Sequence, residues 1–272
     1  MRFVCTVVLG MLFLTTGAQP GTPDVKVTSE RKENGFVLYA SNSQYCPVSL
    51  LFNFELQNVS FSGGGQKVFV VPAQNGKWKI GELTVTGKGA TKFSFRYFTE
   101  LGDVTVNKWD TAYPYDLPFK KGASFRIFQG YNGTFSHTNE NALDFSMPEG
   151  TELFAAREGV VVKVVQNNNQ SCPSPECQQY NNYIAIYHPD GTIARYVHLR
   201  YNGANVRPGD VIRKGQLIGY SGNTGWTSGP HLHFVCTAPN FEKKQTMKTL
   251  FRINKGEQVV YLEEKQTYLR DY

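Results

Sequence analysis

Apolar and polar residues alternate along residues 25–106, in short runs such as GFVLYA, SLLFNFELQ, QKVFVVPA and TKFSFRYF. Alternation with a period of two is typical of half-buried β-strands, because successive side chains of a strand point to opposite faces. Gly, Asn, Ser and Pro separate these runs at short, regular intervals. The pattern predicts an antiparallel β-sandwich of the immunoglobulin-like kind over residues 24–108.

The strand pattern is interrupted at residues 107–122, NKWDTAYPYDLPFKKG, where prolines and aromatic residues indicate a connection packed against a domain. Short strands then resume in ELFAAREGVVVKVVQ, NYIAIYHPDGTIARYVHL, DVIRKGQLIGYSG and HLHFVC. The PDG sequence within the second run predicts a tight turn between two strands. We therefore expect a second antiparallel β domain over residues 109–272, and a mainly β protein.

The chain begins with MRFVCTVVLGMLFLTTGA, which combines a basic residue, an apolar stretch from Phe3 to about Leu14, and small residues ending at Ala18. This is the composition of a secretory signal peptide, and the apolar stretch is too short for a membrane span. We predict a signal peptide over residues 1–18 and export to the periplasm or the extracellular cell envelope. An uncleaved anchor is the alternative; after removal of the signal peptide we expect no membrane span.

The charge of the mature chain is mildly basic. Removal of Arg2 with the signal peptide lowers the formal net charge from +6 to +5. A basic surface on an exported protein is attracted to anionic envelope polymers, although a solvated face is the more usual meaning of such a run. We expect no nucleic-acid partner and a monomer. The basic residues concentrate after the GPHLHF stretch, at Lys243, Lys244, Lys248, Arg252 and Lys255.

Four cysteines follow the predicted signal peptide. Because export places them in an oxidising compartment, we expect Cys172 and Cys177 of CPSPEC to close a short loop by a disulfide. Zinc ligation by these two is the rival interpretation, and it lacks a second nearby pair of ligands. Pairing of Cys46 with Cys236 stays open, since the two belong to different predicted domains.

Two of the five histidines flank one leucine in GPHLHF, residues 229–234. Residues two apart on a strand point the same way, so His231 and His233 would project from one face of a sheet. An isolated pair of this kind is more often exposed or packed than functional. Other residues must therefore decide its meaning.

A carboxylate and further imidazoles accompany this pair. His137 in SHTNENALDF stands seven residues before Asp144, and His198 ends the strand YVHL. Such groups from separate strands can form a zinc set, and three protein ligands leave a fourth position for water. The HExxH motif is absent, which excludes a helical zincin site. His188 precedes the PDG turn, where we expect an exposed residue outside any site.

Three motifs carry a more specific signal: SHTNENALDFSMPEGTELFAAREGVV, HPDGTIARYVHL and VRPGDVIRKGQLIGYSGNTGWTSGPHLHF. They resemble, in order and separation, the motifs of the lysostaphin-type (LytM-like) zinc endopeptidases, which cleave peptides of bacterial peptidoglycan. The resemblance runs from about Phe125 to Phe234 and does not reach residues 25–110. It implies that residues 109–272 form a lysostaphin-type β-sheet catalytic domain.

Carried over position by position, the resemblance makes His137, Asp144 and His233 the ligands of Zn²⁺. It makes His198 and His231 the catalytic pair outside the metal shell. The implied activity is that of an exported zinc metalloendopeptidase, a peptidoglycan hydrolase in which a zinc-activated water attacks stem-peptide or cross-bridge bonds. The alternative is a noncatalytic metal-binding regulator or adhesin that recognises cell-wall peptides or a protein partner. Because all five residues are present, we favour the enzyme.

One position departs from the family's pattern. Many members place the aspartate four residues after the first histidine, where this chain has Asn141. The DFSMPEGT sequence that begins at Asp144 still fits the family, so we assign the ligand there and expect a longer loop before it. Glu140 is the substitute ligand that we consider.

Several questions stay open at the level of sequence. They are the peptide bond that is cleaved, the division of roles between His198 and His231, and the role of residues 24–108 as a targeting domain, an inhibitory domain or a spacer. The insertion QNNNQSCPSPECQQYNN either forms one wall of the cleft or is a surface loop without a role. Tyr131 in QGYNG either lines the cleft or packs as an ordinary tyrosine.

Overall fold

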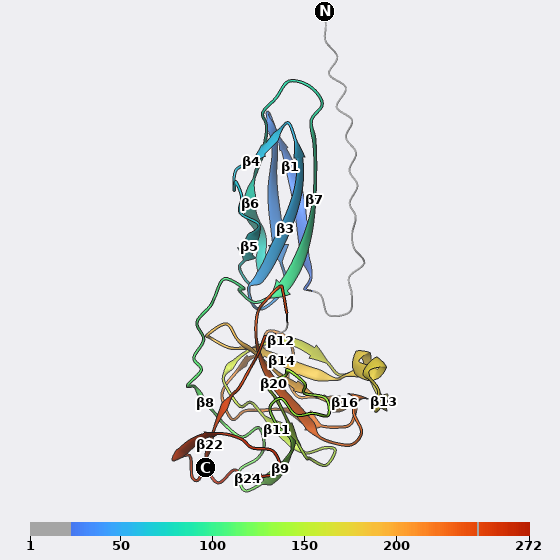
Figure 1. The fold of residues 1–272 in the computed structure, drawn as a ribbon, viewed down its shortest axis with the longest axis vertical. Helices are drawn as coiled ribbons and strands as arrows, with labels where there is room; N and C mark the ends of the chain where they lie inside the picture. Colours follow the sequence, from blue (N-terminus) through green and yellow to red (C-terminus); the bar gives the residue numbers. More distant parts are fainter. Residues whose placement is uncertain (1–22, 244) are drawn as a thin grey trace, which may run out of the picture. The chain divides into compact units, whose positions relative to one another are not determined.

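The computed structural model describes residues 23–243 and 245–272. The chain divides into two compact units, one ending at Val104 and one spanning Thr105–Tyr272 (Figure 1). Each unit has its own hydrophobic core. The predicted boundary, between residues 108 and 109, lies slightly further along the chain. The predicted signal peptide over residues 1–18 lies outside the described residues. Within the described part, no helix has the length and apolar character needed to cross a membrane.

Two antiparallel sheets make up the first unit. One has the strand order β1-β2-β6-β4, and the other has the order β5-β3-β7 (Figure 1). The strands are β1 (Val25–Lys32), β2 (Gly35–Asn42), β3 (Val48–Gln57), β4 (Val59–Phe61), β5 (Val68–Val71), β6 (Asn75–Val85) and β7 (Lys92–Leu101).

Aromatic side chains fill the space between these two sheets. Phe54 of β3 stacks on Phe61 of β4 with ring centroids 4.7 Å apart, and Phe61 meets Phe69 of β5 edge-on at 5.8 Å. Leu38 of β2 and Leu50 of β3 are fully buried in the same cluster. One face of each sheet is therefore covered by the other, as the alternating pattern predicts, and the β-sandwich is confirmed. Its immunoglobulin-like character stays a prediction.

The second unit is built on one long antiparallel sheet, in the order β17-β12-β14-β15-β20-β10-β9-β24, with β21 also paired to β20. The mainly β, antiparallel fold is thus confirmed. The strands are β9 (Ser124–Gln129), β10 (Ala142–Phe145), β12 (Gly159–Val165), β14 (Tyr183–Tyr187), β15 (Ile193–Val197), β17 (Val211–Ile212), β20 (Leu232–Ala238), β21 (Gln245–Met247) and β24 (Thr267–Leu269).

Smaller elements surround this sheet. A three-stranded sheet contains β11 (Glu152–Phe154), β18 (Leu217–Ser221) and β16 (Leu199–Ala204), and another contains β23 (Gln258–Tyr261), β22 (Leu250–Ile253) and β8 (Pro114–Tyr115). A short parallel pair joins β13 (Ser171–Cys172) to β19 (Gly225–Trp226), next to the 3₁₀-helix η1 (Pro175–Tyr180).

The cysteines follow the sequence expectation where it was specific. Cys172 and Cys177 form a disulfide, as predicted for CPSPEC. Cys46 and Cys236 are both buried free thiols, one in each unit. Burial raises the pKa of the Cys46 thiol to about 12, so it is protonated and inert at neutral pH.

The expectation that His188 is an exposed turn residue is wrong. Its side chain is fully buried, and its Nδ1 donates a hydrogen bond to the carbonyl of Glu158 at 2.7 Å. The turn does form after it, but His188 continues the inward alternation of Ile184 and Ile186 on β14, both of which are fully buried. His188 is therefore a core histidine.

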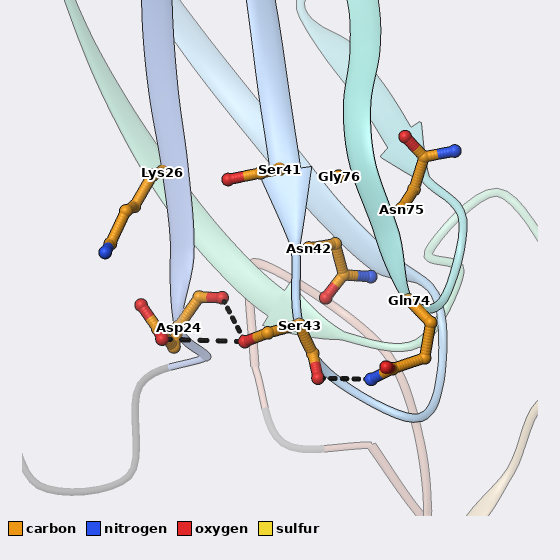
Figure 2. Close-up of a pocket in the computed structure, with 8 residues that line it drawn as sticks. All are labelled: Asp24, Lys26, Ser41, Asn42, Ser43, Gln74, Asn75 and Gly76. Carbon is orange, nitrogen blue, oxygen red and sulfur yellow. Dashed lines mark hydrogen bonds between the residues drawn. The ribbon is translucent and has the colours of Figure 1, made fainter.

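A polar pocket lies at one end of the first unit (Figure 2). Its polar groups bond one another and the backbone: Ser43 Oγ donates to the Asp24 carbonyl, and the Asn42 amide donates to the carbonyls of Cys46, Val71 and Pro72. The side chains of Ser43 and Asn42 thus form their hydrogen bonds within the first unit. Its lining residues are Asp24, Lys26, Ser41, Asn42, Ser43, Gln74, Asn75 and Gly76.

Candidate metal centre

The register of β10 and β20 places Asp144 directly opposite His233. Directly opposite residues of an antiparallel pair project from the same face, so the carboxylate and the imidazole are neighbours. The residues on either side of them point the other way, into the core, and fix this orientation by their burial. They are Leu143, Phe145, Leu232 and Phe234, all at most 1% exposed.

His137 reaches the same point from the loop that follows β9. Its backbone N–H donates to the Gly133 carbonyl, and its ring Nδ1 lies 3.0 Å from the Gly130 carbonyl. A carbonyl only accepts hydrogen bonds, so Nδ1 carries the proton and Nε2 presents its lone pair to the other two residues. The ring is completely buried, which holds it in this orientation.

The three donor atoms lie at the spacing that a zinc ion requires. His137 Nε2 is 3.2 Å from His233 Nδ1 and 3.2 Å from Asp144 Oδ2, and His233 Nδ1 is 3.0 Å from Asp144 Oδ1. Tetrahedral zinc with bonds near 2.0–2.1 Å separates its ligand atoms by about 3.3 Å. The two imidazoles and one carboxylate therefore fit Zn²⁺. Within the described part of the chain, these three side chains form a group that could hold a metal ion.

The electrostatics of this trio also favour a cation. Burial opposes the charge on Asp144, but hydrogen bonds from His137 and His233 outweigh it and hold the pKa of the carboxyl well below its usual range. Burial likewise opposes protonation of His137, yet the adjacent Asp144 raises the pKa of that imidazole above its ordinary value. A negative carboxylate that draws a proton onto its neighbour would also attract a metal ion to the same point.

His198 and His231 form a second group beside the trio. Their ring centroids are 4.6 Å apart, and His198 lies 5.9 Å from the ring of His233. His198 follows the last residue of β15, and its backbone adopts a left-handed φ of 67°. His231 immediately precedes β20, two residues before His233.

Both rings of this second group are held by backbone carbonyls. Nδ1 of His198 lies 2.8 Å from the Thr224 carbonyl, and Nδ1 of His231 lies 2.8 Å from the Gly229 carbonyl. Each Nδ1 therefore donates, which leaves each Nε2 with a lone pair. Burial, and then the neighbouring imidazoles, lower the pKa of His198 to about 3, and burial also lowers the pKa of His231. Both are neutral proton acceptors at pH 7.

The residues considered as alternatives lie outside the trio. Glu140 Oε1 is 3.8 Å from Nε2 of His233, whereas the other ring nitrogen, Nδ1, is the one that faces Asp144. Asn141 donates through its amide to the Thr246 carbonyl. The longer loop before Asp144 thus lets His137 enter the site from three residues earlier than the common spacing.

Residues 138–247 match peptidase family M23. The chain contains a peptidase family M23 domain. The match includes Asp144, His198, His231 and His233, and it begins one residue after His137. The recognised resemblance to the lysostaphin-type family is therefore confirmed.

The chain is similar to two curated relatives whose names state different specificities. The peptidoglycan DD-endopeptidase ShyA of Vibrio cholerae is 32% identical over 139 residues, which are 51% of this chain and 29% of ShyA. The glycyl-glycine endopeptidase ALE-1 of Staphylococcus capitis is 32% identical over 117 residues, which are 43% of this chain and 28% of ALE-1. The chain thus spans less than a third of the length of these two relatives.

Among solved structures, the catalytic domain of lysostaphin from Staphylococcus simulans is 28% identical to the M23 domain. The superposition covers 46% of this chain and 87% of that one, with a TM-score of 0.34. A score this low adds nothing to the family assignment, which stands on the sequence match.

Two residues of the second unit lie near the site and carry no signal in the sequence pattern. Gln129 donates to Asp144 Oδ2 at 3.2 Å, and the Thr224 carbonyl accepts from His198. Gln129 and Tyr131 both lie in the QGYNG stretch. The Tyr131 hydroxyl donates to the Thr249 carbonyl at 2.8 Å. Nothing in the local pattern reveals that Gln129 and Asp144 are cross-strand partners.

Proposed function

We propose that this protein is an exported zinc endopeptidase that hydrolyses peptide bonds of bacterial peptidoglycan. The observation that carries the proposal is the convergence of His137 Nε2, Asp144 and His233 Nδ1 beside the neutral pair His198 and His231. The M23 match and the endopeptidase activities named for ShyA and ALE-1 support the same reaction, and the name of ShyA supports peptidoglycan as the polymer. The two relatives differ in the bond they name, so the proposal includes stem-peptide and cross-bridge amides.

Zinc in this site would polarise a substrate carbonyl and lower the pKa of water, which supplies the electrophilic part of amide hydrolysis. The protein contributes the placement of its own groups. Gly130 and Gly133 hold His137, and strand pairing holds Asp144 against His233. Strand register and backbone hydrogen bonds thus bring the donor atoms together.

His198 and His231 are placed to handle protons. Because Nδ1 of each ring donates to a carbonyl, Nε2 of each can accept the proton of an attacking water or later donate one to the leaving amine. The protonated ring could also stabilise negative charge on the carbonyl oxygen. These roles require rings that start neutral, and the lowered pKa of each ring supports that.

A noncatalytic metal-binding regulator or adhesin would need only the three metal ligands. Such a protein has no use for two further histidines whose proton positions are fixed by backbone carbonyls. The presence of His198 and His231 at the trio therefore favours the enzyme.

Export forms part of the proposal. It rests on the signal-peptide composition of residues 1–18, and the Cys172–Cys177 disulfide supports an oxidising compartment. Detection of the mature chain in the periplasm or the medium, with an N-terminus near residue 19, tests it. An uncleaved N-terminus in the purified protein would contradict it.

Zymography on purified peptidoglycan tests the activity. We expect clearing by the mature chain, loss of clearing with a chelator, and recovery when zinc is restored. Mass spectrometry of the released fragments then identifies the bond. Zinc binding without any release of fragments would favour the noncatalytic alternative.

A further inference from the structure

Gln129 lies in one row with two of the proposed metal ligands. It is the last residue of β9, and the strand register places it directly opposite Asp144, which in turn lies opposite His233. Opposite residues in neighbouring antiparallel strands share a face, so the three side chains form a line across β9, β10 and β20. Gln129 is buried, with only 3% of its surface exposed.

The Gln129 amide uses both of its ends. Its Oε1 accepts hydrogen bonds from the backbone N–H groups of Phe135 and Ser136, at 3.1 and 3.0 Å. Its Nε2 donates to Ser136 Oγ at 2.8 Å and to Asp144 Oδ2 at 3.2 Å. Backbone N–H groups can only donate, so the oxygen must face the loop and the NH₂ group must face Asp144.

One amide therefore ties together two ligands that are distant in sequence. Asp144 is held directly, and the backbone at residues 135–136 is held just before His137. The next residue in the chain, Gly130, provides the carbonyl that orients the His137 ring. Gln129 and Gly130, two consecutive residues, therefore hold both Asp144 on its strand and His137 on its loop.

The loop is shaped to admit this side chain. A Cβ atom at Gly133 would lie 2.4 Å from Gln129 Cγ, closer than real atoms pack. The same Gly133 offers its carbonyl to the His137 N–H. Glycine at 133 is therefore what allows Gln129 and the His137 loop to occupy their positions together.

We propose that Gln129 is a positioning residue of the metal centre, which sets the affinity for zinc by holding Asp144 and the His137 loop in the binding geometry. The proposal rests on the metal site of the proposed function but not on its peptidase activity. Hydrogen bonds to ligating carboxylates typically change metal affinity by about 10- to 100-fold when removed. An affinity change of that size is the expected signature.

The test compares Gln129→Met with Gln57→Met in the full mature chain. Methionine keeps the length of the side chain and removes all four hydrogen bonds of Gln129. Gln57 is also the last residue of a strand, but it is exposed in the other unit. Apparent zinc affinity is measured by competition with a chromophoric chelator, and circular dichroism and thermal unfolding of the metal-free proteins report on folding.

We expect zinc affinity to fall about 10- to 100-fold in Gln129→Met and to match that of wild type in Gln57→Met. Hydrolysis by Gln129→Met should recover at saturating zinc. An affinity within twofold of wild type in a folded Gln129→Met would overturn the role of Gln129 while leaving the metal site intact. A wild-type chain that binds no zinc would overturn the metal site and this proposal with it.

Gln129→Glu provides a second readout if Gln129→Met does not fold. The glutamate keeps the two acceptor contacts to the loop N–H groups and replaces only the NH₂ group that faces Asp144. With Co²⁺ in place of zinc, we expect its visible absorption spectrum to differ from that of wild type, because the carboxylate ligand is oriented differently. An unchanged spectrum together with unchanged Co²⁺ affinity would overturn the proposal.

Discussion

Asp144 and His233 are cross-strand partners on β10 and β20, and His233 Nδ1 lies 3.0 Å from Asp144 Oδ1. The pairing is a property of strand register, so it exists before any ion is bound. A one-residue slip of either strand would turn one of these side chains into the core and destroy the pair. Burial of the alternate apolar residues on both strands prevents that slip.

Substitution of a ligand should remove the ion without unfolding the domain. We expect His233→Ala to lose stoichiometric zinc and all hydrolysis, since two remaining ligands bind far more weakly than three. Zinc content after dialysis against a weak chelator, measured by elemental analysis, checks this. The same result is expected for Asp144→Ala, because that change also leaves the two imidazoles without their anionic partner.

A separate pair of substitutions distinguishes metal binding from proton transfer. We expect His198→Ala and His231→Ala each to retain zinc and to lose about 10²- to 10⁴-fold in kcat, the usual contribution of a general acid or base. Release of fragments from purified peptidoglycan is the measurement, with zinc content determined on the same samples. Full activity in His231→Ala would contradict this division of roles.

The fold class could be predicted, and the residues of the candidate site could be proposed, because their signals are local or specific. Alternation with a period of two marks strands wherever one face is buried, as on β2 and β3 of the first unit. His231 and His233 share a strand, so a spacing of two places them on one face without knowledge of the rest. The resemblance to known motifs then pointed to His137, Asp144 and His198.

The remainder depends on register and burial, which the local pattern does not contain. His188 resembles a turn residue because PDG follows it, but the alternation of β14 carries its ring inward. Gln129 resembles any polar residue at a strand end until β9 and β10 are aligned and Asp144 lies opposite it. Thr224 acts through its backbone carbonyl, so its side-chain type gives no signal for that contact.

The segment at residues 166–182, which contains the Cys172–Cys177 disulfide, is connected to His198 through hydrogen bonds. The Thr227 N–H donates to the Cys172 carbonyl at 3.1 Å, and the Asn182 N–H donates to Thr224 Oγ1 at 3.1 Å. Thr224 in turn accepts the Nδ1 hydrogen of His198 through its carbonyl. Loosening this segment should therefore shift His198 while leaving the three metal ligands in place.

Replacement of both cysteines tests this connection. We expect Cys172→Ser with Cys177→Ser to keep zinc and to lose about 10- to 100-fold in kcat, the range typical of a small misplacement of a catalytic group. The chain-entropy model also predicts a loss of about 2 kcal/mol of stability for so short a loop. Cys46→Ser is the matched control, since that thiol lies in the other unit. Loss of zinc in the double variant would show that the segment acts on the ligands instead.

The buried His188 should make stability depend on pH. Burial is the largest cause that lowers its pKa from 6.5 to about 4, and the nearby Arg157 guanidinium lowers it further, while Glu158 and Asp190 oppose the shift. Among the described residues, Nε2 of His188 has no hydrogen-bond partner that could stabilise an added proton. The folded protein therefore resists protonation that the unfolded chain accepts.

Because the folded-state pKa lies below the unfolded value, the unfolded chain binds this proton first as the pH falls. The neutral ring's contribution to stability is thus fully present above about pH 6.5 and is lost as the pH falls toward 4, by about 3 kcal/mol in total.

His188→Gln cannot titrate but keeps an amide donor for the Glu158 carbonyl. Denaturant unfolding at several pH values between 4 and 7 should show a free energy of unfolding that falls more steeply in wild type than in His188→Gln. Other titrating groups are common to both proteins and cancel in the difference. Parallel curves would therefore mean that the pKa of His188 is the same in the folded and unfolded states.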